Sequence, residues 1–191
     1  MKIPFHKPNL PSDLNLIFPN SVYDGWLTTG YQVDLFENKL ASYLGAKHVV
    51  ALNSCTAALH LALEAKGFSS GDKFIVPALT FASTVECGEY IGMKPILIDS
   101  VDNGFLFDLN RVEDIVKKDN TVKAIIPMHY GGEAVDLNFL WSLAEKYGLF
   151  ILEDAAHALE TVSVRNVKVG NTDHAAAFSF YANKNITTGG E

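Results

Sequence analysis

Polar side chains that could bind an anion follow the first apolar run of the sequence. The segment NSCT at 53–56 opens a helical pattern, and a helix N-terminus combines unpaired backbone N–H groups with the positive end of the helix dipole. The hydroxyl groups of Ser54 and Thr56 add two donors, which suits a phosphate. The same hydroxyl groups are common helix caps, so a purely structural role stays open. The segment lacks the glycine patterns of nucleotide-binding loops.

Two carboxylates lie at the end of another apolar run, in the segment ILEDAAHA at 151–158. Open α/β sheets bind ligands at the carboxyl ends of their strands, where Glu153 and Asp154 are expected. A buried carboxylate needs a positive partner, and Asp154 suits a protonated ring nitrogen. A helix cap or a partner for an arginine is the alternative. His157 is either a hydrogen-bond donor in the same site or a partly exposed loop histidine.

The last segment, FSFYANKNITTGGE at 178–191, contains Ser179 and Lys184. Ser179 lies between two phenylalanines, so in a strand its hydroxyl points to the opposite face. A lysine that reacts as an amine needs a pocket or a nearby carbonyl partner, whereas a single lysine is more often a solvated surface group. In combination, an anion cradle, a carboxylate for a ring nitrogen and a lysine amine are what pyridoxal 5′-phosphate (PLP) requires.

The elements that must position these groups are predicted by an alternation of short apolar runs and helical patterns. This alternation is typical of a mostly parallel sheet covered by helices. Helices are expected at about 33–45, 54–67, 108–118 and 136–148. Strands are expected at 48–52, 73–77, 95–99, 122–127, 149–154 and 175–180. Because the three polar groups follow strand ends, we expect them to converge at one edge of the sheet.

The composition excludes several classes of protein. Of the 191 residues, 48% are hydrophobic and 19% charged, which is typical of a folded globular chain. A net charge of −7 disfavours nucleic acid and anionic membrane as partners. Cys55 and Cys87 form no CxxC pair, no apolar run reaches the length of a membrane span, and the first residues lack a signal-peptide pattern. We therefore expect a cytoplasmic protein.

Six segments in this order resemble the DegT/DnrJ/EryC1/StrS family of PLP-dependent sugar aminotransferases. They are GWLTTG (25–30), LNSCTAALHLAL (52–63), VPALTFASTVE (76–86), IIPMHYGG (125–132), ILEDAAHA (151–158) and FSFYANKNITTGGE (178–191). The resemblance runs from about residue 4 to the last residue. It implies a three-layer α/β/α fold of the aspartate aminotransferase type (fold type I), and a homodimer with active sites at the subunit interface.

The resemblance also implies a role for each candidate residue. Lys184 corresponds to the Schiff-base lysine, which later moves a proton, and it argues against the family's dehydratases, in which histidine replaces this lysine. Asp154 corresponds to the partner of the pyridine nitrogen, and Phe81 to the aromatic residue that stacks on the cofactor ring. The other cofactor-binding residues are Ser54, Cys55 and Thr56 in the phosphate loop, Ser179 as a phosphate ligand and His157 near the phenolic oxygen. Cys55 departs from the common pattern, which often has glycine.

Four prolines and few periodic apolar positions predict that residues 1–30 form a loop-like N-terminal arm. The resemblance implies that residues 31–191 form an incomplete PLP-binding large domain. The family pattern continues after residue 191 into an antiparallel strand, located between the first and sixth strands, and then into a smaller C-terminal domain. Without that strand, the strands expected at 48–52 and 175–180 would lie roughly 10 Å apart with unpaired edges. We therefore expect the 191 residues alone to have little or no turnover.

The predicted function is transfer of an amino group from an amino acid, expected to be glutamate, to a keto group of a nucleotide-linked sugar. Such a reaction belongs to the biosynthesis of amino sugars or cell-surface polysaccharides. A non-catalytic PLP-binding or regulatory fragment is the alternative. A metal hydrolase using His129, Glu153, Asp154 and His157 is disfavoured, because these residues lack metal-ligand spacing and leave Lys184 without a role. We expect no metal site.

Overall fold

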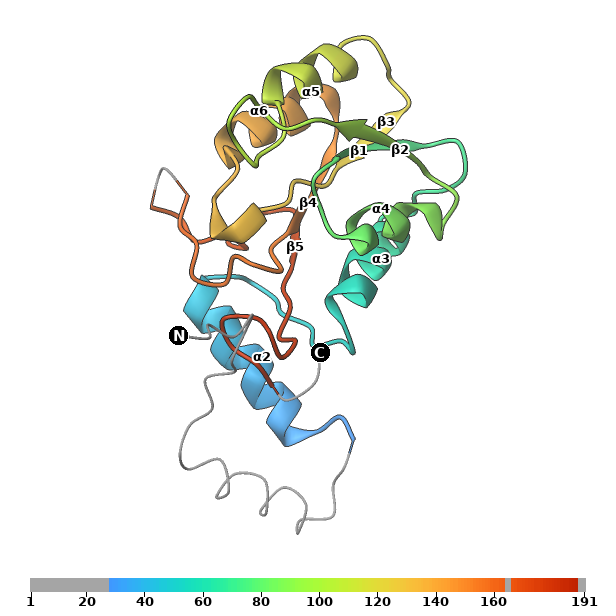
Figure 1. Cartoon of the computed structure of the whole chain (residues 1–191). Helices are drawn as coiled ribbons and strands as arrows, with labels where there is room; N and C mark the ends of the chain where they lie inside the picture. The colour runs from blue at the N-terminus through green and yellow to red at the C-terminus, as the bar shows by residue number, and fades with distance from the viewer. Residues whose placement is uncertain (1–27, 164–165, 189–191) are drawn as a thin grey trace.

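A parallel sheet forms the centre of the computed structural model, which describes residues 28–163 and 166–188 (Figure 1). Within that range its strand order is β2-β1-β3-β4-β5, and every neighbouring pair is parallel. The strands are β1 (Lys73–Pro77), β2 (Lys94–Ile98), β3 (Val122–Ile125), β4 (Phe150–Asp154) and β5 (Ala175–Ala177). They confirm five of the six predicted strands, although β5 ends short of residue 180. The arm predicted at 1–30 lies outside the described residues, except for its last three positions.

Four helices confirm the helical patterns of the sequence: α2 (Tyr31–Leu44), α3 (Cys55–Ala65), α5 (Leu109–Val116) and α6 (Leu137–Tyr147). Side chains of Ser54, Asp108 and Asp136 accept backbone N–H bonds at the starts of α3, α5 and α6. In the described part of the chain, no helix combines the length and the apolar character that a bilayer span requires. A short 3₁₀ turn, η1 (Tyr130–Gly132), follows β3.

A further helix, α4 (Ala82–Glu89), was not predicted from the sequence. Its buried face is made of small and polar residues, Ser83, Thr84, Cys87 and Gly88, so it shows no apolar stripe. Gly88 explains the close packing, because a Cβ atom there would lie 2.4 Å from the ring of Phe74 on β1. The small residues therefore let α4 approach the sheet, and they also hide the helix from a hydrophobicity pattern.

Alternate residues along the strands bury two separate cores, one on each face of the sheet. On one face, Ile75, Ile125 and Ile151 pack against apolar side chains of α5 and α6. On the other, Phe74, Val76, Ala124, Ile126 and Leu152 pack against Leu59 and Leu63 of α3 and Cys87 of α4. Helices on both faces of a parallel sheet form the predicted three-layer arrangement.

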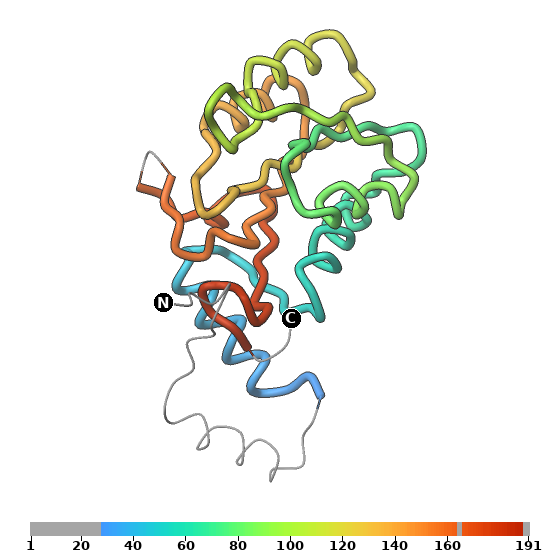
Figure 2. The backbone as a smooth tube through the Cα atoms, in the orientation of Figure 1, coloured from blue at the N-terminus to red at the C-terminus, as the bar shows by residue number. Residues whose placement is uncertain are grey.

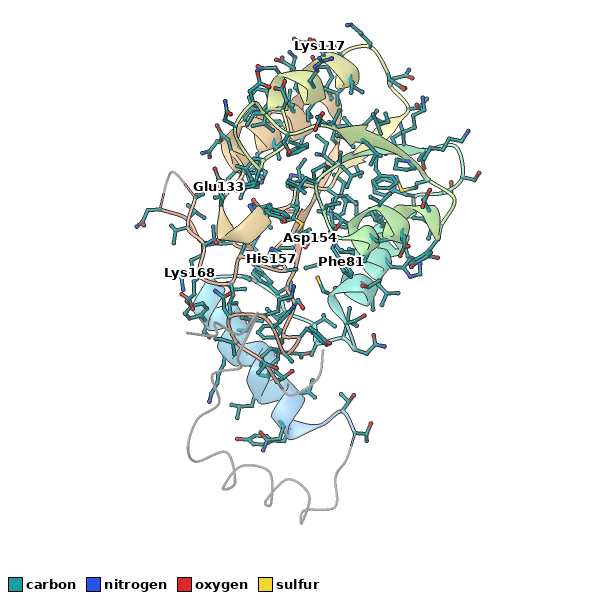
Figure 3. The ribbon with its side chains drawn as sticks, in the orientation of Figure 1. Phe81, Lys117, Glu133, Asp154, His157 and Lys168 are labelled. Carbon is teal, nitrogen blue, oxygen red and sulfur yellow. The ribbon has the colours of Figure 1, made fainter. Side chains whose placement is uncertain are left out.

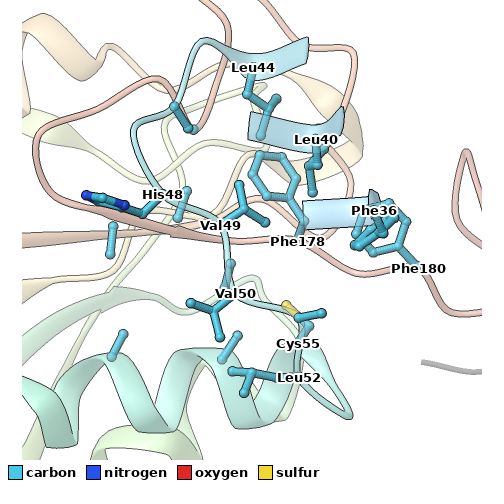
Figure 4. Close-up of a pocket in the computed structure, with 18 of the residues that line it drawn as sticks. Phe36, Leu40, Leu44, His48, Val49, Val50, Leu52, Cys55, Phe178 and Phe180 are labelled. Atoms are coloured by element: carbon cyan, nitrogen blue, oxygen red, sulfur yellow. The ribbon is translucent and has the colours of Figure 1, made fainter. Parts of the chain in front are cut away.

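The strand predicted at 48–52 is wrong, because these residues run as irregular chain. The backbone N–H of Ala51 donates instead to Glu37 Oε1 on α2, at 2.7 Å. Between this segment and the chain around β5 lies an apolar cavity of about 840 Å³, lined on one side by Val49 and Val50 and on the other by Phe178 (Figure 4). A strand needs a neighbour for its ladder hydrogen bonds, and no described segment occupies this cavity.

After β5 the chain turns back beside α2, as the red and blue parts of the trace show (Figure 2). The ring of Phe180 contacts Phe36 of α2 edge to face, with centroids 5.1 Å apart. A turn then follows in which the Lys184 N–H donates to the carbonyl oxygen of Tyr181 at 2.9 Å. Packing against α2 thus directs the chain out of the sheet and sets the position of Lys184.

Two consecutive glycines in η1 provide a matched test of how closely this turn packs against the segment that follows β4. Both have positive φ, 61° at Gly131 and 87° at Gly132. A Cβ at Gly132 would lie 3.2 Å from the carbonyl oxygen of His157, whereas one at Gly131 would meet nothing within 4 Å. We expect Gly131→Ala to lower the free energy of unfolding by about 1–2 kcal/mol, the cost of a left-handed alanine, and Gly132→Ala to lower it more. Urea unfolding of both variants checks this order, and an equal loss would contradict it.

Candidate cofactor site

Asp154, the last residue of β4, is a buried carboxylate at the carboxyl edge of the sheet, with a side chain that is 2% exposed. Leu152, two residues earlier, packs against α3 and α4, and Asp154 faces the same side. Its Oδ2 accepts a bond from the Thr84 hydroxyl at 2.6 Å, and its Oδ1 accepts one from the Ala156 N–H at 3.1 Å. Within residues 28–163 and 166–188 it has no cationic partner at ion-pair distance. Such a carboxylate is suited to a ligand that brings a positive charge.

Thr84 is a site residue that sequence reasoning missed. It is fully buried in α4, and its hydroxyl also accepts a bond from the Thr80 hydroxyl at 2.8 Å. The available signal was the spacing of three residues from Phe81, which places both in the first turn of one helix. Because no helix was predicted here, the spacing did not indicate that Thr84 and Phe81 share a helical turn. Thr84 holds the Asp154 carboxylate in place, so it belongs to the site through Asp154.

We expect Thr84→Val to weaken both the fold and the site, since it keeps the shape and removes the donor to a buried carboxylate. The free energy of unfolding should fall by about 1–3 kcal/mol, and affinity for PLP by roughly tenfold. Urea unfolding and a spectroscopic cofactor titration measure the two effects. Thr121→Val is the matched control, because the exposed Thr121 hydroxyl donates to Asp119 at the other end of the sheet. Equal cofactor affinity in the two variants would contradict the role of Thr84.

His157 lies close to Asp154 and Lys184. Burial lowers the pKa of His157, the positive charge of Lys184 lowers it further, and the Asp154 carboxylate opposes both. The Nδ1 atom of His157 accepts a bond from the Gly131 N–H at 3.3 Å, and its ring meets Tyr130 edge to face. The structure therefore brings together Asp154, His157 and Lys184, three residues that the sequence placed in one site.

Lys184 is half-buried in the turn after Phe180. Among the described residues its ammonium group has no ion-pair partner, and its electrostatic effect is on His157. Ser179 is also half-buried, and its hydroxyl oxygen accepts the Tyr181 N–H at 3.3 Å. Both side chains follow the end of β5, so they lie at the same sheet edge as Asp154.

The N-terminus of α3 lies where the sequence predicted an anion cradle. Ser54 caps it by accepting the Ala57 N–H at 3.0 Å, so the structural role left open for this hydroxyl is present. The next two residues, Cys55 and Thr56, form the first turn, where backbone N–H groups point along the helix axis away from the helix. Ser54 and Cys55 line the same cavity as Phe178 and Phe180, which flank Ser179. The start of α3 and the residues on either side of Ser179 therefore border one cavity.

Phe81 comes directly before α4, and its side chain is 71% exposed. Three residues later in the same turn lies Thr84, which bonds Asp154. Figure 3 shows Phe81, Asp154 and His157 in the same region of the molecule. A large apolar ring left open beside a buried carboxylate is suited to cover a flat ligand.

These groups fit PLP on four separate counts. The α3 N-terminus suits its phosphate, the buried Asp154 carboxylate suits its ring nitrogen, Phe81 suits its ring face, and the Lys184 amine suits its aldehyde. The observation that carries the fit is the buried carboxylate that has no cation among the described residues. When bound, PLP supplies an electron-accepting ring that stabilises negative charge on a substrate carbon.

The residues of the disfavoured metal site do not gather in the structure. Glu153 contacts His129 and Gly170, whereas Asp154 contacts Thr84, because neighbouring residues of β4 point to opposite faces of the sheet. The described residues contain no group of three or more His, Cys, Asp or Glu side chains arranged for a metal ion.

The sequence profile of the DegT/DnrJ/EryC1/StrS aminotransferase family matches residues 15–191. The spore coat polysaccharide biosynthesis protein SpsC of Bacillus subtilis is 42% identical over 187 residues, which cover 94% of this chain and 47% of SpsC. The UDP-4-amino-4-deoxy-L-arabinose–oxoglutarate aminotransferase of Shewanella sediminis is 37% identical over 164 residues, which cover 86% of this chain and 41% of that protein. The chain thus spans about half the length of the curated relatives it matches.

A solved structure agrees with the sequence comparison. Spr1654 of Streptococcus pneumoniae, in its PLP form, superposes with a TM-score of 0.91 at 29% identity, covering 100% of this chain and 52% of that chain. The fold is therefore that of the type I, PLP-dependent aminotransferases, as predicted. Aminotransferases of the matched family depend on PLP, which agrees with the fit of the residues described above.

Proposed function

The chain belongs to the DegT/DnrJ/EryC1/StrS aminotransferase family, and from that premise we propose that the protein transfers an amino group to a keto group of a nucleotide-linked sugar. Two relatives support this substrate class by their names, one in spore coat polysaccharide biosynthesis and one acting with a UDP-linked amino sugar. The second relative also names oxoglutarate, which is the product when glutamate gives up its amino group. Glutamate is accordingly the proposed donor.

The roles of the residues follow from their chemistry. The first turn of α3, with Ser54, Cys55 and Thr56, holds the phosphate together with Ser179. Asp154 holds a positive charge on the ring nitrogen, with its own position set by Thr84. Phe81 covers the ring face, which excludes water from it and fixes its plane.

Lys184 has two proposed tasks. Its amine holds the cofactor covalently, and once displaced by the substrate amine it moves a proton at the substrate carbon that carries the nitrogen. His157 contributes a hydrogen bond near the phenolic oxygen. Because burial and the charge of Lys184 lower the pKa of His157, the imidazole stays neutral near pH 7 and can donate only through the one ring nitrogen that carries its proton.

We also propose that residues 31–191 form a PLP-binding large domain completed by chain beyond residue 191. Relatives about twice as long support this, as does the apolar cavity between 48–52 and the chain around β5. Thr188, close to the end of the sequence, lines that cavity, so continuing chain can enter it as a strand. An antiparallel strand there would give residues 48–52 the ladder partner that none of the described segments provides. The proposed assembly is a cytoplasmic homodimer.

An assay with the full-length protein tests the proposed function. It combines PLP, glutamate and a panel of nucleotide-linked keto sugars, and it measures 2-oxoglutarate formation. Formation that depends on one keto sugar is the expected result. Covalent PLP on Lys184 without transfer to any sugar would favour the non-catalytic, cofactor-binding alternative, and absence of both would contradict the proposal. The same assay on the 191-residue chain is expected to give little or no turnover.

A further inference from the structure

A buried His129–Glu153 pair lies on the face of the sheet opposite Asp154 and is not among the cofactor-binding residues. Both side chains are 0% exposed, and His129 Nε2 lies 3.3 Å from Glu153 Oε2. The same Oε2 accepts the Gly170 N–H at 3.3 Å. The other oxygen, Oε1, is buried without a hydrogen-bond partner in the described part of the chain. Burying a carboxylate oxygen without a hydrogen-bond partner costs folding free energy, so a role other than stabilising the fold has to be considered for this pair.

The hydrogen bonds of His129 fix its tautomer. Its Nδ1 accepts the Val135 N–H at 3.1 Å, so that nitrogen carries no proton. The proton is then on Nε2 and is donated to Glu153, which makes the contact a neutral imidazole bonded to a carboxylate. Glu153 thereby selects the tautomer of His129 that can hold the backbone of Val135. The pair ties the two ends of the loop 129–135 together.

The loop held in this way contacts the cofactor-site segment in three further places. The His129 N–H donates to the Asp154 carbonyl at 3.1 Å, and the Thr161 hydroxyl donates to the Gly132 carbonyl at 2.7 Å. Between them, the Gly131 N–H donates to His157 Nδ1 at 3.3 Å. Since Nδ1 of His157 accepts this bond, the neutral ring of His157 carries its proton on Nε2.

We propose that His129 and Glu153 are positioning residues for His157: they hold the 129–135 loop so that the Gly131 N–H occupies Nδ1 of His157 and leaves Nε2 as its donor nitrogen. A donor at Nε2 suits an acceptor oxygen such as the phenolic oxygen of PLP. This proposal rests on the proposed function only for that last step. The hydrogen bonds that link Glu153 to His157 through the 129–135 loop do not depend on the proposed function.

A purely stabilising role predicts a different outcome. Apolar side chains of similar volume often replace a buried polar pair with no loss of stability. Such a replacement would leave the Val135 N–H without its side-chain acceptor, and the loop would lose its closure. A positioning role therefore predicts a change at His157, at the far side of the 129–135 loop, whether or not the free energy of unfolding changes.

The test is ¹⁵N NMR of histidine-labelled protein without cofactor, which distinguishes a protonated from an unprotonated ring nitrogen in each imidazole. In the unmodified protein we expect His157 protonated on Nε2 only. Glu153→Gln should preserve this pattern, because the amide oxygen can accept from both His129 and Gly170. Glu153→Leu should give a mixture of His157 tautomers and about tenfold faster exchange of the Val135 amide hydrogen.

A matched control is Asp119→Asn, which weakens the Lys73–Asp119 ion pair (2.6 Å) at the other end of the sheet and should leave His157 unchanged. If Glu153→Leu does not fold, His129→Gln gives the same test, since an amide cannot span both Val135 and Glu153. A folded variant of either kind that keeps the single His157 tautomer would overturn the proposal. So would Glu153→Gln losing that tautomer. Because this readout needs neither PLP nor turnover, its failure is separate from failure of the proposed function.

Discussion

Lys184→Ala is expected to abolish covalent attachment of PLP and to lower the rate of transamination by at least about 10³-fold. The half-buried amine lies beside His157, whose pKa it lowers, and no ion pair with a described carboxylate neutralises it. Alanine removes both the group proposed to bond the aldehyde and the base proposed to move the proton. Borohydride treatment followed by mass spectrometry measures attachment, and 2-oxoglutarate formation measures the rate.

The matched control for this variant is Lys168→Ala. Lys168 is also half-buried, but its ammonium group lies over the ring of Tyr43 on α2, 3.0 Å from the centroid. Its loss should leave cofactor attachment and rate within about twofold, since it removes a surface cation–π contact. The same variant also tests whether Lys184 lies near His157, independently of catalysis. The pKa of His157 should rise in Lys184→Ala, because a nearby positive charge is gone. Covalent cofactor on Lys184→Ala would refute the assignment of this lysine.

The parallel strands could be predicted because each is a short apolar run between two helical layers. The segment KFIVP at 73–77 is buried on both faces in the structure and forms β1 with the predicted bounds. The segment HVVAL at 48–52 is a similar, mostly apolar run of five residues, but it forms no ladder. The local sequence pattern indicates a tendency to form extended backbone, whereas a strand also requires a neighbouring strand for its hydrogen bonds. In the described part of the chain, no such neighbour lies in the cavity beside Val49. The error thus marks the place where continuing chain is proposed to bind.

The site could be predicted only in part, for a related reason. Lys184, Asp154 and His157 were recognisable by residue type and by position after strands, and the structure brings them together. Thr84 and the His129–Glu153 pair were not, because their roles depend on contacts between segments far apart in the sequence. Thr84 reaches Asp154 across 70 residues, and Glu153 reaches His129 across 24. Sequence pattern finds groups that react, but it does not find groups that position them.

Asp154→Asn is expected to lower the rate of transamination by about 10²–10³-fold while leaving PLP covalently attached. An asparagine keeps the shape and can keep the bond from the Thr84 hydroxyl, so the fold should persist. It loses the negative charge, and without that charge a positive ring nitrogen at a buried position is disfavoured by several kcal/mol. A change in the visible absorption of the bound cofactor should accompany the loss of rate. Asp119→Asn, which alters a carboxylate remote from this edge, should change neither quantity.

The pKa of the Cys87 thiol gives a second measurement of the Asp154→Asn substitution, and this one needs no cofactor. Burial raises the pKa of the Cys87 thiol to about 12, and the negative charge of Asp154 adds to that effect. Removing this charge must lower the thiol pKa, although burial keeps it above its ordinary value. The ¹³Cβ chemical shift of Cys87, which distinguishes thiol from thiolate without a reagent entering the core, should therefore titrate at lower pH in Asp154→Asn and at unchanged pH in Thr84→Val, which keeps the carboxylate. If the thiol titrates identically in both variants, Asp154 carries no charge at this edge, and its role as partner of a ring nitrogen fails with it.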